Sequence, residues 1–214
     1  MSTIRKLAIP TALATALFGT GLWLVLEKDA PPDAFDHGPV DQTGWKWSDY
    51  RSAVLPHSEA DGPYEIDEGL AHGFSHSRAG ALLAATHIGA RIRSQVGPSI
   101  YEPTITDQTT GPGRDTLLGE TRDQYGLTGE ESPGGTAKLV GYRFLVSDPQ
   151  QATLELLVSP EGKTTRYSAK LDLQWDGSDW KLVIPESGGW LPQLPDALTQ
   201  EDFELFTGGA NEGT

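Results

Sequence analysis

The feature that most constrains this sequence is an uncharged, mostly apolar run at residues 7–26, LAIPTALATALFGTGLWLVL. Arg5 and Lys6 precede the run, and Glu27 follows it. A bilayer core about 30 Å thick needs ~20 predominantly apolar residues in a helix, and the run meets that length. We therefore predict a single transmembrane helix over residues 7–26, with the remaining chain on one side of the membrane.

The flanks of the run distinguish a retained anchor from a cleaved secretory signal. A signal has an apolar centre of only ~7–15 residues, followed by a small-x-small cleavage site. Here Trp23, Leu24 and Val25 continue the apolar run, and the first suitable small residue beyond it is Ala30. The sequence has no cysteine, which excludes a lipoprotein-type attachment. A retained anchor is the favoured interpretation, and a cleaved signal is the alternative.

The charges beside the run predict its orientation. Lys and Arg next to a transmembrane helix stay on the cytoplasmic side. We therefore expect residues 1–6, which contain Arg5 and Lys6, to be cytoplasmic. The chain from Glu27 onward is then extracytoplasmic, which makes this a single-pass protein of the cell membrane.

The extracytoplasmic part is strongly acidic. The whole sequence has 16 basic and 30 acidic residues and a net charge of −14; without Arg5 and Lys6 it has 14 basic residues and a net charge of −16. Such a surface repels phosphate backbones, so we expect no nucleic-acid partner and attribute the acidity to solubility. Without cysteine there are no disulfides, and a hydrophobic core must stabilise the domain.

Residues 27–70 are predicted to be an extracytoplasmic linker, because this Pro-, Gly- and acid-rich stretch has no helical or alternating period in its first part. Three aromatic residues interrupt it: Trp45, Trp47 and Tyr50. They are candidate partner-binding residues. The alternative, which we favour, is that they strap the linker to the folded domain, because aromatic side chains near a domain edge are mostly buried within their own chain.

The main helix is predicted over residues 77–96, with Ser75 or Ser77 as its N-cap. Its interior is rich in alanine and glycine, which lets a helix approach a sheet closely. A shorter helix is predicted over residues 115–125, within an otherwise irregular region that ends in a loop.

From residue 136 onward, apolar residues recur at every second position. This alternation predicts four strands, at residues 136–147, 151–159, 164–175 and 180–184. Consecutive strands with short turns form an antiparallel meander, and its apolar face needs the preceding helix as a cover. We therefore predict an α+β domain at residues 71–207, with helices packed in the concavity of a curved four-stranded antiparallel sheet. Residues 208–214 are expected to be a disordered tail.

The order of these elements, together with the hairpin WDGSDWKLVIP, resembles the nuclear-transport-factor-two-like superfamily over about residues 75–187. This resemblance implies a cystatin-like cone. An N-terminal anchor joined to such a cone resembles the inner-membrane scaffold subunit of type IV secretion and conjugation machines. The segment from Trp45 to the main helix is also similar to an uncharacterised actinobacterial membrane-anchored family associated with mobile elements, which implies a location but no activity.

Histidines are the best candidate metal ligands, but their spacing argues against a site. His72 and His76 are four residues apart with Gly73 between them, and the H-E-x-x-H order is absent. His87 is eleven residues beyond His76, or ~16 Å along a helix. Ser75 is not in a G-x-S-x-G elbow. We therefore predict no catalytic, cofactor-binding or metal-binding residue, no cofactor and no enzyme activity.

Related cones hold small molecules, and four aromatic residues are candidate pocket-lining positions here: Tyr142, Tyr167, Trp175 and Trp180. Aromatic side chains on the inward-facing positions of a strand more often belong to a core, which is the alternative.

We predict an extracytoplasmic scaffold or assembly subunit of a conjugation or secretion complex. It would contact the bilayer through residues 7–26 and bind protein partners or copies of itself. The alternative function is a membrane-tethered small-molecule-binding or catalytic cone domain.

Overall fold

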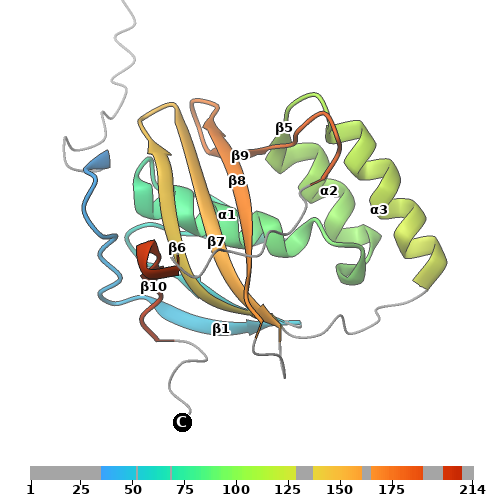
Figure 1. Ribbon diagram of the computed structural model, residues 1–214. Coiled ribbons are helices and arrows are strands. Elements are labelled where there is room, and N and C mark those ends of the chain that lie inside the picture. The colour runs from blue at the N-terminus through green and yellow to red at the C-terminus, as the bar shows by residue number, and fades with distance from the viewer. Residues whose placement is uncertain are drawn as a thin grey trace, which may run out of the picture.

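The computed structural model describes residues 35–51, 53–67, 69–128, 137–160, 165–189 and 200–208. These residues form an α+β fold in which three α-helices pack beside and behind one large curved sheet (Figure 1). Within the described ranges, no helix is long and apolar enough to cross a membrane. The predicted transmembrane helix at residues 7–26 lies outside them.

The large sheet has eight strands in the order β1-β2-β6-β7-β8-β9-β5, and β10 pairs with β6 beside this path. Its strands are β1 (Lys46–Tyr50), β2 (Ala53–His57), β5 (Thr109–Thr110), β6 (Ala137–Ser147), β7 (Gln151–Pro160), β8 (Tyr167–Trp175), β9 (Trp180–Val183) and β10 (Glu204–Leu205). A separate two-stranded sheet consists of β3 (Glu65–Asp67) and β4 (Leu70–His72).

The prediction of a four-stranded antiparallel cone is wrong. Strands β6 to β9 do form an antiparallel meander, but β2 pairs with β6 in parallel at Ala53↔Ala137, and β5 pairs with β9 in parallel at Thr109↔Leu182. The sheet is therefore mixed. The physical reason is that the meander leaves two open edges, and segments predicted as linker or loop supply strands that cover them.

Three helices accompany the sheet: α1 (Arg78–Arg91), α2 (Pro98–Gln108) and α3 (Arg114–Thr128). Ser77 is the N-cap of α1, and its hydroxyl accepts a hydrogen bond from Gly80 N at 3.0 Å. The predicted main helix stops short of residue 96, because a 3-10 turn at Ser94–Val96 separates α1 from α2. Helix α2 occupies a region predicted to be irregular, and it begins with Pro98, whose fixed φ suits a first helical turn.

The core lies between α1 and the inner face of β7, β8 and β9. Among its fully buried side chains are Leu82, Leu83, Ile88, Leu154, Leu173, Trp180 and Leu182. Close approach at the start of α1 depends on Gly80, where a Cβ would lie 1.9 Å from Ser75 O. The interior is thus filled by the chain's own side chains.

The two ends of the described chain are bonded to each other and to β6. We call residues 40–47 and 203–208 the terminal clasp. Gln42 Oε1 accepts a hydrogen bond from Thr207 N at 2.8 Å, and Trp47 Nε1 donates to Thr207 O at 3.1 Å. On β6, the Tyr142 hydroxyl donates to Glu204 Oε2 at 2.7 Å. The clasp holds the segment nearest the predicted anchor against the central sheet.

Candidate functional site

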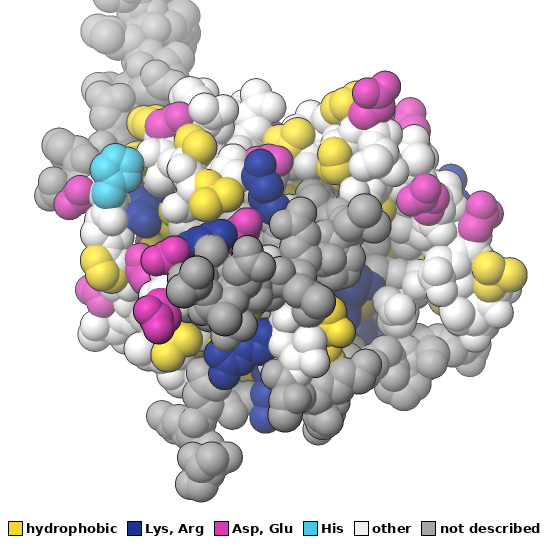
Figure 2. All heavy atoms as spheres, in the orientation of Figure 1, with side chains coloured by type: hydrophobic (Ala, Val, Ile, Leu, Met, Phe, Trp, Pro, Cys, Tyr) yellow, Lys and Arg dark blue, Asp and Glu magenta, His cyan; other side chains and the backbone are white. Residues whose placement is uncertain are grey.

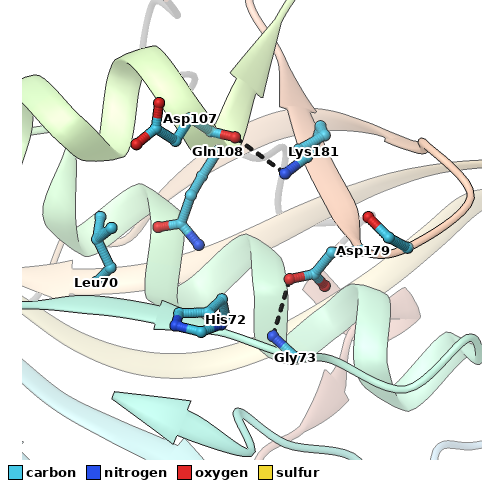
Figure 3. Close-up of a pocket in the computed structure, with 8 residues that line it drawn as sticks. Leu70, His72, Gly73, Asp107, Gln108, Asp179 and Lys181 are labelled. Carbon is cyan, nitrogen blue, oxygen red and sulfur yellow. Dashed lines mark hydrogen bonds between the residues drawn. The ribbon is translucent and has the colours of Figure 1, made fainter. Parts of the chain in front are cut away.

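A pocket of about 360 Å³ opens where β4, the end of α2 and the β8–β9 hairpin meet (Figure 3). It is lined by Leu70, His72, Gly73, Asp107, Gln108, Ser178, Asp179 and Lys181. Its volume is at the small end of the range for ligand sites. Most of these lining residues are polar, and they come from three segments far apart in the sequence.

Three hydrogen bonds join the pocket walls in pairs. Gln108 Nε2 donates to Ala71 O at 2.6 Å and joins α2 to β4. Lys181 Nζ donates to Asp107 O at 2.9 Å and joins β9 to α2. Asp179 accepts from Gly73 N at 2.8 Å and joins the hairpin to the segment after β4. The latter two bonds are drawn in Figure 3. The pocket is therefore held in shape before any ligand arrives.

Asp179 has a structural role. Its carboxylate accepts hydrogen bonds from the backbone amides of Gly73, Phe74 and Trp180, at 2.8, 3.1 and 2.9 Å. The residue is only 8% exposed. Both carboxylate oxygens accept from backbone amides, and these hydrogen bonds compensate for the cost of burying the carboxylate. It is poorly placed to act as a general base.

Lys181 brings a cation to the pocket. Besides its bond to Asp107 O, Nζ lies 3.4 Å from Asp176 Oδ2, and the side chain is 23% exposed. A lysine ammonium has three N–H donors, and these two contacts use two of them. Among the described contacts, one donor of Lys181 is left unused.

Gln108 contributes a buried acceptor without a donor. The residue is 4% exposed, and within the described chain Oε1 has no hydrogen-bond partner. Exchanging the amide's oxygen and nitrogen would set Oε1 against Ala71 O, two acceptors facing each other, so the orientation is fixed by chemistry. An unmatched buried acceptor costs ~1–3 kcal/mol.

His72 and Leu70 are the half-buried side chains that β4 contributes to the pocket. The His72 side chain is 38% exposed, and its Nε2 lies 3.8 Å from Glu65 Oε2, too far for a hydrogen bond. Ser178 also lines the pocket, but its hydroxyl donates to Asp176 Oδ1 at 2.8 Å instead of to a histidine. Ser178 is therefore held in the β8–β9 turn by its own hydroxyl.

The candidate partner-binding residues pack on their own domain. Trp45, Trp47 and Tyr50 are half-buried against the main core. Trp47 also meets Phe206 edge-to-face at 5.5 Å, and the Arg91 guanidinium lies 4.1 Å from the centre of the Tyr50 ring. Their packing matches the strap interpretation, while their role toward a partner stays a prediction.

None of the four candidate pocket-lining aromatic residues lines the pocket described above. Tyr142 and Trp180 are completely buried in the core, and burial together with the Glu204 carboxylate raises the pKa of Tyr142. Trp175 meets Trp180 edge-to-face at 5.5 Å, and Tyr167 is half-buried at the start of β8. The two residues that define the pocket chemistry, Gln108 and Lys181, carry no sequence motif.

The histidines considered as metal ligands lie in three separate places. His76 stacks on Trp175 at 4.2 Å, whereas His87 is buried and bonded to Pro56 O at 2.7 Å. His72 lines the pocket. In the described ranges no group of three or more His, Asp or Glu side chains could hold a metal ion.

Large exposed apolar side chains are few in the described residues: Tyr64, Ile66, Leu127, Leu145, Val146 and Leu205. Figure 2 shows apolar groups scattered singly or in small clusters over the visible face, between acidic and basic side chains. Among the described side chains visible on this face, the apolar groups do not merge into a broad patch.

A family model described as "Domain of unknown function (DUF8175)" matches residues 27–201. No curated protein and no solved structure shows significant similarity to the chain. The match covers more than half of the sequence, and the chain belongs to the DUF8175 family.

Proposed function

We propose that this DUF8175 protein is a membrane-anchored extracytoplasmic assembly subunit, a scaffold component of a conjugation-like or secretion complex. In this proposal residues 7–26 hold it in the bilayer, and its folded domain binds protein partners or further copies of itself. The type of complex rests on the resemblance of an anchored α+β domain to inner-membrane scaffold subunits.

The observation that carries the proposal is the terminal clasp. Eight residues separate Leu26, at the end of the predicted helix, from Phe35, where the described structure begins. Fully extended, they span at most about 30 Å. Because the clasp then fixes residues 40–47 to β6 and to the C-terminal segment, the domain would be held close to the membrane. A short connection between the membrane and a segment that is hydrogen-bonded to the sheet suits a subunit that positions partners.

Two further features support assembly over catalysis. The space between α1 and the sheet is filled by core side chains of the described residues. At one end of the strand order, β1 has β2 as its only strand neighbour in the described chain. Such an edge exposes backbone groups that can pair with another chain.

Cysteine crosslinking of the full chain in membranes tests this proposal, because the sequence has no cysteine of its own. Ser48→Cys places a thiol on exposed β1, and Asp123→Cys places one on exposed α3 as a matched control. We expect crosslinked products of defined size from Ser48→Cys only. Exclusively monomeric chain from both variants would contradict the proposal.

A further inference from the structure

We propose that β1 pairs antiparallel with β1 of a second copy of this chain, so that the eight-stranded sheet continues across a two-fold axis at Ser48. This inference rests on the proposed assembly function and names the partner for it. Figure 1 shows β1 at the lower border of the sheet, and β2 is its only strand neighbour among the described residues.

The register of β1 against β2 determines which backbone groups face the open edge. Trp47 lies opposite Pro56, which has no N–H, so these two residues are not a hydrogen-bonded pair of the ladder. Pro56 O instead binds the His87 imidazole at 2.7 Å. Because the direction of the backbone groups alternates along a strand, Trp47 and Asp49 point their N–H and C=O groups away from β2. The open edge therefore offers two donors and two acceptors.

This edge is self-complementary in an antiparallel pair. When Ser48 of one copy lies opposite Ser48 of the other, Trp47 of each copy meets Asp49 of the other, and four backbone hydrogen bonds form. The residue on the axis meets its own copy, where a charged side chain would be repelled. Ser48 is small, uncharged and exposed, and hydroxyl side chains can hydrogen-bond across neighbouring strands.

The charges of β1 also favour this register. Lys46 and Asp49 are exposed and lie on either side of Ser48. With a rise of about 3.3 Å per residue, Lys46 lies about 3 Å along the strand from Asp49 of the second copy. The two Asp49 residues are about 7 Å apart along the strands, and the two Lys46 residues about 13 Å. The nearest charges across the axis therefore have opposite signs, although their side chains leave opposite faces of the sheet.

The edge is held in place before a second copy binds. Near the start of β1, Trp47 Nε1 donates to Thr207 O at 3.1 Å. At its end, the Tyr50 ring lies 4.1 Å from the Arg91 guanidinium. A strand that is already ordered loses little conformational entropy when it pairs.

Disulfide formation by the full chain in membranes tests the inference, because the sequence has no cysteine of its own. Opposed residues outside the hydrogen-bonded pairs have Cα atoms about 4.5 Å apart, a separation that a disulfide spans. Under mild oxidation we expect Ser48→Cys to give mainly disulfide-linked dimer. Lys46→Cys, on the same face of β1, should give no more dimer than Asp123→Cys on exposed α3, because its two copies are too far apart.

A proline variant separates pairing at the edge from folding. Asp49→Pro removes an N–H that points away from β2, and proline is tolerated on edge strands. In the Ser48→Cys chain it should slow disulfide formation about tenfold, since each dimer loses two backbone hydrogen bonds. Asp49→Ala keeps the N–H and should stay within about twofold of the parent rate. Urea unfolding of each variant confirms that it is folded.

Four outcomes would overturn the inference. Equal dimer yields from Ser48→Cys and Lys46→Cys would show that the strands have no fixed register. An unchanged rate in the folded Asp49→Pro chain would exclude backbone pairing at this edge. Membrane particles with several copies or other proteins, but without a Ser48→Cys dimer, would contradict the pairing and leave the assembly function standing. Exclusively monomeric chain would contradict both.

Discussion

At the scale of single residues, the most consequential group is His87, which is buried on α1 without a carboxylate partner among the described contacts. Its Nε2 donates to Pro56 O, which leaves Nδ1 to accept from Arg91 Nη1 at 3.0 Å. Burial, followed by the Arg91 charge, lowers the pKa of His87 to about 3. The imidazole therefore stays neutral throughout the physiological range.

This lowered pKa makes stability depend on pH. An unfolded histidine takes up a proton below about pH 6.5, whereas folded His87 does so only near pH 3. Between these values the unfolded state holds the extra proton, so stability falls with falling pH by about 1.4 kcal/mol per unit. Urea unfolding at several pH values should show a shallower dependence for His87→Gln than for half-exposed His72→Gln. Equal slopes would contradict the assignment.

Asp179 is the second residue with a clear prediction. Asp179→Asn replaces one acceptor oxygen by an N–H₂ group that faces a backbone donor, so at least one of its bonds to Gly73, Phe74 and Trp180 is lost. We expect a loss of about 2 kcal/mol in the free energy of unfolding. Asp123→Asn on exposed α3 is the control and should change little. Calorimetry or urea titration measures both, and similar values for the two variants would refute the structural role.

At the scale of elements, α1 contains two glycines with opposite surroundings. A Cβ at Gly80 would lie 1.9 Å from Ser75 O, while a Cβ at Gly89 meets nothing within 4 Å. Gly89→Ala should stabilise the protein by about 0.5–1 kcal/mol through helix propensity. Gly80→Ala should destabilise it by more than about 2 kcal/mol despite the same gain. Thermal unfolding of both variants gives the answer, and a stabilised Gly80→Ala protein would contradict the packing.

The elements also show what the sequence can and cannot predict. Alternating apolar residues locate β6 to β9, because period two reflects burial of one face. A register shift between Leu139 and Gly141 breaks this alternation, and Val140 joins a second small cluster with Leu157 and Phe203. No local pattern reveals such a bulge, nor the added strands β1 and β2.

The same limit applies to the pocket. Gln108 and Lys181 are brought together because β5 follows α2 directly and pairs with β9. A two-residue strand leaves no periodic signal, and parallel pairing over this sequence distance depends on the whole fold. His72, by contrast, was considered from the sequence as a metal ligand, but the sequence does not show which residues lie next to it in the fold.

At the scale of the whole molecule, the terminal clasp connects the segment that follows the predicted anchor to the sheet. Trp47→Ala removes the ring contact with Phe206 and the bond to Thr207 O, so we expect a loss of about 1–2 kcal/mol. Amide hydrogen exchange should speed up at Phe206, whose N–H donates to Val140 O. Leu127→Ala, at an 86% exposed site, is the control. Unchanged exchange at Phe206 in Trp47→Ala would contradict the clasp.

We propose that this DUF8175 domain assembles with other chains at the membrane surface. The most direct measurement is the mass of the particle that carries the full chain after extraction in native nanodiscs. Our account predicts particles with several copies of the 23.0 kDa chain, or with additional proteins in fixed ratio. Particles that contain a single copy and no partner, at native expression level, would contradict it.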